Sequence, residues 1–153
     1  MSDALAEAWL HAWTTEGGFA DCCTADVSYE DPLTAVPLTG GAEIDAHAAL
    51  MRSALPDAAI EATAPMLEGG GHACIPWKLT GTHDGEVGPL PPTEKSLALH
   101  GLHYVELKDG RISRARGFFD LYEGAVQLGL LPQRGGLGEA ALLMLRGFGL
   151  RGR

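Results

Sequence analysis

The chain has 153 residues, a length typical of one domain. Hydrophobic residues make up 46% of it and charged residues 20%, which is enough apolar surface for a packed core and too much for an intrinsically disordered chain. The formal net charge of −9 argues against a nucleic-acid partner, because phosphate binding requires a basic surface.

In the first part of the chain, helical spacing of apolar residues predicts the helices. Paired glycines and prolines mark where one element ends and the next begins. Gly17-Gly18 marks the end of the first helix, and Pro56 ends the last helix of this part because proline removes a helical hydrogen bond. The expected elements are a helix over 3–15, a short helix over 19–24, a strand over 25–30 and a helix over 42–55.

The next part of the chain alternates between apolar and polar residues and predicts antiparallel strands. We expect strands over about 60–64 and 72–83, followed by two runs joined by Asp109-Gly110, which is the strongest short-range hairpin signal. Pro76 marks an edge or a bulge within its strand, because proline cannot donate to a ladder. Helices first and strands after them predict an α+β fold, in which N-terminal helices pack on one face of a curved antiparallel sheet.

The C-terminal part predicts a last short helix over 122–131 and then a change of composition. We expect one domain over 1–132, followed by a Gly- and Arg-rich extension over 133–153. Within this extension the apolar stretch AALLMLRGF predicts a short helix.

Cysteine usage indicates a cytoplasmic location. Cys22, Cys23 and Cys74 are an odd number, and neighbouring cysteines rarely bridge each other, which fits a reducing compartment. We expect no secretory signal and no membrane span, because the start of the chain is acidic and no apolar run is long enough. No metal-ligand spacing or nucleotide-binding motif occurs, so we expect neither a metal nor a cofactor.

Counting outward from the Asp-Gly turn assigns faces to the hairpin and pairs His103 with Arg116. In this register one face also carries Phe118 and Asp120. A one-residue bulge would bring Tyr104 to that face instead.

Asp120 is the candidate for acid/base chemistry. It ends the apolar stretch GFFDLY, where desolvation would raise its pKa toward the range that suits proton transfer, whereas a nearby Arg116 would lower it. The alternative is that Asp120 caps the helix that starts near Leu121 or pairs with Arg116.

His103 is the second candidate, because a histidine in mid-strand can polarise a carbonyl or relay a proton. The alternative is a core histidine bonded to the backbone or to Glu106. Further residues that could line a cavity, or only pack, are Tyr29, His47, Trp77 and His83.

The motifs VSYEDP, WKLTGTHDG, PLPPTEKSLALHG, DGRISRARGFFD and QLGLLP occur in the order of the SnoaL-like polyketide cyclases, which the chain resembles over roughly 5–132. The resemblance implies a cone-shaped α+β barrel of the nuclear-transport-factor and ketosteroid-isomerase type with one open mouth. It also implies aldol ring closure without metal or cofactor, with Asp120 at the position of the family's acid/base and His103 nearest to its pocket histidine. Arg116 departs from the family, which often has an aromatic residue there, and a homodimer is expected.

Three functions stay open at this point. The first is a cyclase for a polyketide or a similar, largely apolar molecule, in which Asp120 removes a proton next to a carbonyl and His103 or Arg116 stabilises the enolate. The second is isomerisation, or epoxide opening by Asp120, Arg116 and Asp31. The third is a non-catalytic ligand-binding or dimerisation module.

Overall fold

The computed structural model describes residues 2–147, which form five helices and seven strands. In chain order the elements are α1 (Ser2–Thr14), α2 (Phe19–Cys22), β1 (Cys23–Glu30), β2 (Leu38–Thr39), α3 (Gly41–Ala54), β3 (Ala59–Ala62), β4 (Leu67–Gly69), β5 (His72–Thr82), β6 (Ser96–Lys108), β7 (Arg111–Phe119), α4 (Leu121–Gln127) and α5 (Leu137–Leu145). The predicted elements are present within a few residues of their expected bounds. The short strands β2 and β4 were not predicted.

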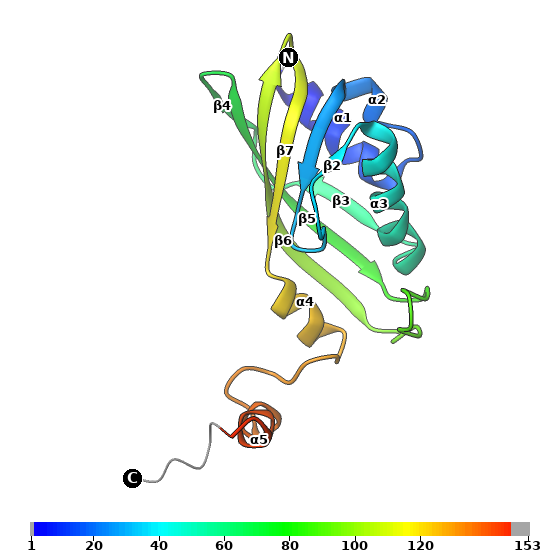
Figure 1. Cartoon of the computed structure of the whole chain (residues 1–153), viewed down its shortest axis with the longest axis vertical. Coiled ribbons are helices and arrows are strands. Elements are labelled where there is room, and N and C mark those ends of the chain that lie inside the picture. The colour runs from blue at the N-terminus through cyan, green and yellow to red at the C-terminus, as the bar shows by residue number, and fades with distance from the viewer. Residues whose placement is uncertain (1, 148–153) are drawn as a thin grey trace.

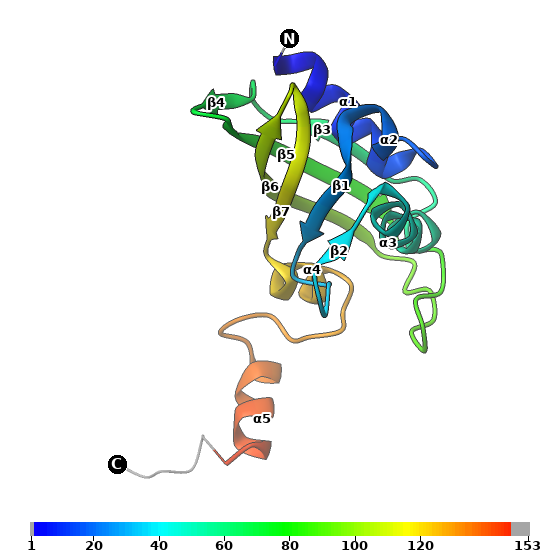
Figure 2. The ribbon, with the colours of Figure 1, turned by 45° about the horizontal axis from the view of Figure 1, so that its top comes forward.

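The strands form one curved sheet in the order β2-β1-β7-β6-β5-β3, with β4 paired to β5. Helices α1, α2 and α3 lie together on one side of this sheet (Figures 1 and 2). The predicted α+β class is therefore confirmed. The sheet is not antiparallel throughout, however, because β1 pairs with β7 in parallel. This pairing follows from the topology, since the first strand joins the sheet beside the last long strand and runs in the same direction.

Pro76 lies inside the long strand β5, opposite the gap between β3 and β4. Its carbonyl oxygen accepts the N–H of Thr63 on that side. The nitrogen and the carbonyl of one strand residue point to the same side, so the missing N–H of Pro76 faces the gap and costs no ladder bond. The predicted local edge is confirmed.

The β6–β7 hairpin contains a one-residue bulge. Leu107 pairs with Ile112, as counting from the turn predicts. Glu106, however, pairs with Arg114, which leaves Ser113 as the extra residue. A shift of one residue exchanges the two faces of the strand for every position that follows.

The bulge corrects the expected placement of Arg116 and Phe118. Both were expected on the pocket face, but they pair with Tyr104 and Leu102 and are exposed, Phe118 to 49%. Tyr104 shares their face, which is the alternative that a bulge predicts. The inward positions in the middle of β7 belong to the small residues Ala115 and Gly117, and Phe119 at the end of the strand lines the cavity described below.

The core lies between the concave face of the sheet and the first three helices. Its largest fully buried side chains include Trp9 and Phe19 from the N-terminal helices, Ile44 from α3, and Val27 and Ile75 from the sheet. One end of the sheet is therefore well filled, and the polar groups described below lie among these aromatic rings.

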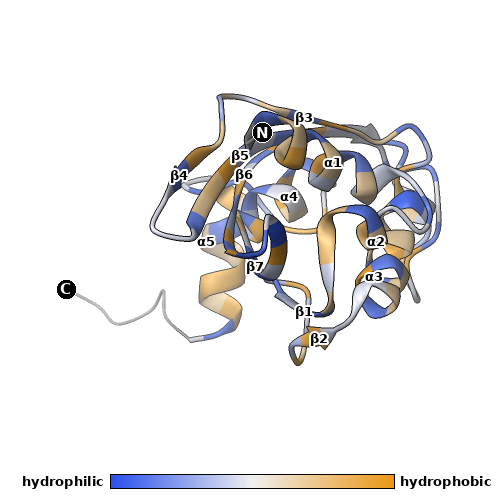
Figure 3. Ribbon diagram, turned by 90° about the horizontal axis from the view of Figure 1, so that it is seen from above, coloured by the Kyte–Doolittle hydropathy of each residue, from blue (hydrophilic) through white to orange (hydrophobic). Residues whose placement is uncertain are grey.

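The C-terminal helices differ in their contact with the sheet. Helix α4 packs on β6 through Gly124, whereas α5 has no buried residue and stands apart from the sheet (Figure 1). The apolar side chains of α5, among them Leu137 at 92% and Leu145 at 85% exposure, colour it largely orange in Figure 3. The helix predicted from AALLMLRGF is confirmed, although it begins earlier. The predicted extension continues over 148–153, which lie outside the described residues.

Within residues 2–147, no helix combines the length and the apolar character needed to cross a membrane.

Candidate functional site

A cavity of about 90 Å³ lies on the concave face of the sheet and is lined by residues of α1, α3 and five strands, together with Asp31 after β1. Its walls are mostly aromatic and aliphatic, with one carboxylate and two histidines. The lining residues are Trp13, Tyr29, Asp31, His47, Met51, Ile60, Trp77, Leu79, Leu99, His103 and Phe119. A larger depression of about 770 Å³ lies beside the β6–β7 turn, but it opens to solvent and most of its charged side chains are exposed. The smaller cavity is the candidate site, because it combines apolar walls with a few convergent ionisable groups.

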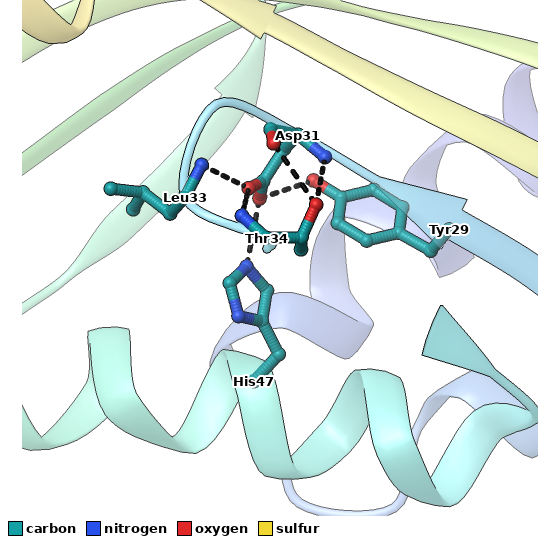
Figure 4. A network of polar contacts seen from close by, with 5 residues as sticks. All are labelled: Tyr29, Asp31, Leu33, Thr34 and His47. Carbon is teal, nitrogen blue, oxygen red and sulfur yellow. Dashed lines mark hydrogen bonds and ion pairs between the residues drawn. The ribbon is translucent and has the colours of Figure 1, made fainter. Parts of the chain in front are cut away.

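Asp31 follows β1 directly and is held by four hydrogen-bond partners (Figure 4). One carboxylate oxygen, Oδ1, accepts the backbone N–H groups of Leu33 at 2.7 Å and Thr34 at 3.1 Å. The other, Oδ2, accepts the hydroxyl of Tyr29 at 2.9 Å and lies 2.8 Å from Nε2 of His47. The tight turn after β1 thus fixes the carboxylate, and α3 supplies the histidine.

The surroundings of Asp31 favour its ionised form. Its side chain is only 4% exposed, and burial by itself raises the pKa of the carboxyl group. The hydrogen bonds from His47, from the backbone of Leu33 and from Tyr29 outweigh burial, and the pKa of Asp31 lies below its ordinary value. An ionised carboxylate accepts the Nε2–H of His47, so in a neutral His47 the other ring nitrogen, Nδ1, is free to accept a proton.

Tyr29 stays protonated beside this carboxylate. Burial raises the pKa of its hydroxyl well above the usual value, and the charge of Asp31 raises it further. Tyr29 is therefore a permanent donor to Asp31 near neutral pH.

His103 lies in the middle of β6 and is a neutral donor. Its Nδ1 accepts a hydrogen bond from the indole Nε1 of Trp9 at 3.0 Å. Because an indole can only donate, Nδ1 carries no proton and the ring proton is on Nε2. Burial lowers the pKa of His103 to about 3, against an opposing effect of the Asp31 charge. The Nε2–H of a neutral imidazole is thus available to a ligand in the cavity.

Gly117, on β7, allows these groups to come together. A Cβ atom at this position would lie 2.7 Å from the hydroxyl of Tyr29, 3.1 Å from Cβ of Asp31 and 3.3 Å from Cδ2 of His103. Real Cβ atoms do not approach other atoms so closely as the shortest of these distances. The sequence signal for this close packing was the position of Gly117 in the middle of a strand, because a glycine there indicates close approach of another group.

Asp120 lies outside the cavity, and its expected desolvation is wrong. Strand β7 ends at Phe119, and Asp120 is the N-cap of α4, with Oδ1 accepting the backbone N–H of Glu123 at 2.9 Å. Its side chain is 54% exposed, and Oδ2 lies 3.8 Å from the guanidinium of Arg134. The alternative of a helix cap is therefore confirmed.

The other predicted residues divide between the cavity and the rest of the fold. Tyr29, His47, Trp77 and His103 line the cavity, as does Asp31, which was considered only for epoxide opening. Trp13 also lines it and was missed, because its helical spacing looked like ordinary core packing.

His83 does not line the cavity, which corrects its prediction as a cavity residue, and it is buried elsewhere in the fold. Its Nδ1 lies 2.9 Å from the hydroxyl of Thr93 and accepts the backbone N–H of the same residue, so it holds the loop between β5 and β6. The predicted triad for epoxide opening does not assemble, because only Asp31 of the three lines the cavity while Arg116 pairs with Glu30. Among residues 2–147, no group of three or more His, Cys, Asp and Glu side chains is arranged to hold a metal ion.

The curved sheet, its three covering helices and its mostly apolar cavity define a ketosteroid-isomerase-like α+β protein. A solved protein of that fold from Catenulispora acidiphila DSM 44928, in complex with trimethylamine, is similar, with a TM-score of 0.70 and 19% identity over 85% of this chain and 95% of that one. The family profile of the SnoaL-like polyketide cyclases matches residues 1–128. The chain therefore belongs to the SnoaL-like polyketide cyclase family, which confirms the predicted resemblance.

Two further solved structures are similar in fold. AclR from Streptomyces galilaeus, described as a candidate hydroxylase, has a TM-score of 0.72 and 19% identity, covering 94% of this chain and 90% of its own. IdmH from Streptomyces antibioticus, described as a candidate polyketide cyclase, has a TM-score of 0.72 and 18% identity, covering 84% of this chain and 99% of its own. No protein with a curated description matches this chain. Family and fold together support a function of the cyclase or isomerase type.

Proposed function

We propose that this protein is a cofactor-independent cyclase or isomerase that enolises a carbonyl compound, with Asp31 and His47 as its proton-transfer pair. The observation that carries this proposal is the buried pair itself. Asp31 is the one carboxylate among the lining residues of the cavity, and its Oδ2 lies 2.8 Å from Nε2 of His47. A carboxylate that orients a histidine is the usual arrangement for general base catalysis.

In the proposed reaction, Asp31 holds the Nε2–H of His47 and leaves Nδ1 as the base. Nδ1 removes a proton from the carbon next to a carbonyl, and the carboxylate stabilises the imidazolium that forms. The Nε2–H of His103 donates to the carbonyl oxygen, where the negative charge of the enolate develops. A neutral imidazole with a strongly lowered pKa suits this role, because it donates without giving up its proton.

The enolate has two outcomes that keep atoms and charge in balance. Attack of its carbon on a second carbonyl of the same molecule closes a ring, and the resulting alkoxide takes a proton back from His47. Return of that proton to a different carbon gives an isomer. We favour ring closure of a polyketide or a similar natural-product intermediate, on the ground of family membership.

The size of the cavity limits how such a substrate would bind. Ligand sites are commonly about 300–1,000 Å³, whereas this cavity holds about 90 Å³. We infer that only the reacting end of a larger, mostly apolar substrate enters this small cavity, or that the walls move apart when it binds.

Deuterium exchange tests this proposal without knowledge of the natural substrate. We expect the protein to catalyse exchange of the hydrogens next to the carbonyl of 1-phenylpropan-2-one in D₂O, followed by proton NMR. His47→Phe keeps a ring in the cavity wall but removes the base, and we expect it to lower the enzymatic rate by roughly 10²- to 10⁴-fold. His72→Phe, at an exposed histidine outside the cavity, is the matched control. Two results would contradict the proposal. One is that the wild-type protein binds the probe but exchanges its hydrogens no faster than buffer does, and the other is that the His47→Phe and His72→Phe variants exchange at equal rates.

We also propose that the chain forms a homodimer through the outer face of the sheet. The exposed Phe118 on that face supports this interface. The cytoplasmic location and the boundary between residues 132 and 133 stay predictions.

A further inference from the structure

Helix α5 exposes apolar side chains on every side. None of its residues is buried. The four residues of its last turn are 43%, 46%, 51% and 85% exposed, in the order Leu142, Leu143, Met144 and Leu145. Successive residues of an α-helix point about 100° apart, so these four cover the whole circumference of the turn. A helix that is apolar all round is typical of a buried environment. The described residues 2–147 do not supply one, because α5 stands apart from the sheet (Figure 1).

The C-terminal extension carries a charge opposite to that of the rest of the chain. Residues 133–153 contain four arginines and one glutamate, which give +3, and because the whole chain carries −9, residues 1–132 carry −12. The glutamate, Glu139, lies in the first turn of α5. Three of the four arginines come after the helix, beginning with Arg146. The apolar last turn is therefore followed in the sequence by positive charges only.

An anionic lipid surface matches both features of this helix. Hydrocarbon surrounds an inserted helix on all sides, and negatively charged headgroups attract arginines at the boundary. The acidic body of a second copy would also attract the arginines. A groove on a protein, however, covers one side of a helix and would leave the other sides of this apolar turn in water. The apolar circumference therefore favours a membrane surface over a second copy of the chain.

The length of α5 determines how it can bind to a membrane. Its nine residues form a helix about 14 Å long, whereas the hydrocarbon core of a bilayer is about 30 Å thick. The helix is therefore too short to span the bilayer and lies within one leaflet. Repulsion between the acidic body and anionic headgroups is screened over about 8 Å at physiological ionic strength, and the position of α5 away from the sheet separates the two (Figure 2).

We propose that α5 is a membrane-docking helix, which inserts its last turn into one leaflet of an anionic lipid bilayer while Arg146 and the arginines after it bind the headgroups. The inference is independent of the proposed function, because α5 contributes no residue to the cavity. It also lies beyond residues 1–128, which the family profile matches, so the family fold does not account for it.

Vesicle flotation of the full-length protein tests this proposal. One set of vesicles consists of phosphatidylcholine, and the other of equal parts of phosphatidylcholine and phosphatidylglycerol. We expect the wild type to float with the anionic vesicles and to bind the neutral ones at least about tenfold more weakly, because each arginine near an anionic surface strengthens binding by about fivefold. Added NaCl is expected to weaken binding to the anionic vesicles.

Glutamine variants separate the apolar contribution from the charge. Leu145→Gln removes an apolar side chain but keeps a good helix former, and we expect it to lower affinity for the anionic vesicles by about 10- to 100-fold. Leu50→Gln is the matched control, because Leu50 is 60% exposed on α3, and it is expected to bind like the wild type. Arg146→Gln is expected to lower affinity for anionic vesicles by about fivefold and to leave binding to neutral vesicles unchanged.

Four results would overturn the proposal. The first three are a wild type that stays in the lipid-free fraction, equal losses in Leu145→Gln and Leu50→Gln, and an affinity that depends on neither lipid charge nor salt. The fourth is a Leu145→Gln variant whose mass by light scattering falls to one chain without lipid, which would assign α5 to contact with a second copy. None of these measurements involves turnover, so their failure is distinguishable from failure of the deuterium-exchange assay.

Discussion

Asp31 and His103 show how the same cavity sets two ionisable groups to different tasks. Burial disfavours the charged form of both groups. Asp31 is nevertheless ionised because four donors compensate, whereas the only charge that favours an ionised His103 is that of Asp31, and the donor Trp9 holds it in one neutral tautomer. A base and a neutral electrophile can therefore coexist at neutral pH.

The lowered pKa of His103 predicts a pH dependence of stability. The unfolded chain binds a proton at this histidine below its ordinary pKa of about 6.5, while the folded chain does so only near pH 3. Between these values the unfolded state binds more protons, so the free energy of unfolding falls as pH falls. We expect His103 to contribute a loss of about 2 kcal/mol between pH 7 and pH 5.

Urea unfolding at pH 7 and pH 5 measures this contribution. His103→Asn is expected to be less stable than the wild type at pH 7 but to lose less stability on acidification. The pH range stops above the ordinary pKa of Asp31, whose lowered pKa adds a further loss only as pH falls below about 4. An identical pH dependence in both proteins would mean that His103 titrates normally.

At the scale of elements, the sequence predicted the hairpin but not its register. Asp109-Gly110 specifies a turn locally, whereas the bulge at Ser113 reflects curvature that depends on pairing with β1 and β5. That single residue moved Arg116 and Phe118 to the outer face. Asp120 lies at the start of α4. Three residues of the predicted site, Arg116, Phe118 and Asp120, therefore lie outside the cavity.

The part of the site that could be predicted comes from positions where local pattern and burial agree. Trp77 and His103 lie in long strands whose inward positions alternate regularly, so their burial follows from periodicity. Asp31 could not be assigned in this way, because its function depends on His47, sixteen residues away on a helix that packs across the end of β1. The sequence predicts the turn after β1, but it does not show that Asp31 in this turn contacts His47.

The packing of β6 against β5 predicts a strong effect of one methyl group. Gly101→Ala would push into the ring of Trp77, and overpacking of this kind costs about 1–3 kcal/mol. Gly69→Ala in β4 is the matched control, because a Cβ atom there meets no atom within 4 Å. Thermal and urea unfolding of both variants measure the difference, and equal stability of the two would show that the Trp77 ring is free to move.

At the scale of the whole molecule, two exposed apolar features are candidates for association. One is the Phe118 side chain, which lies beside the charged Arg116 on the outer face of the sheet. The other is helix α5, which stands apart from the sheet (Figure 2). The family resemblance predicted a homodimer through the sheet. The sequence alone could not show that α5 leaves its leucines uncovered, because a helical pattern gives the length of a helix and not what packs on it.

Light scattering coupled to size exclusion tests the proposed dimer. We expect a mass of twice the 16.1 kDa of one chain. Phe118→Asp is expected to shift the mass toward one chain, whereas Leu145→Asp, at an exposed position of α5, leaves it unchanged. The opposite response of the two variants would place the interface on α5, and a wild-type mass of one chain would rule out the dimer.

The most direct test of the account compares two aspartates in the deuterium-exchange assay. Asp31→Asn keeps the shape of the buried side chain but removes its charge, and we expect exchange of 1-phenylpropan-2-one to slow by roughly 10²- to 10⁴-fold. Asp120→Asn keeps a good helix cap at an exposed position, and we expect exchange within about tenfold of the wild type. Loss of exchange in Asp120→Asn together with normal exchange in Asp31→Asn would contradict the account and return the chemistry to the end of β7.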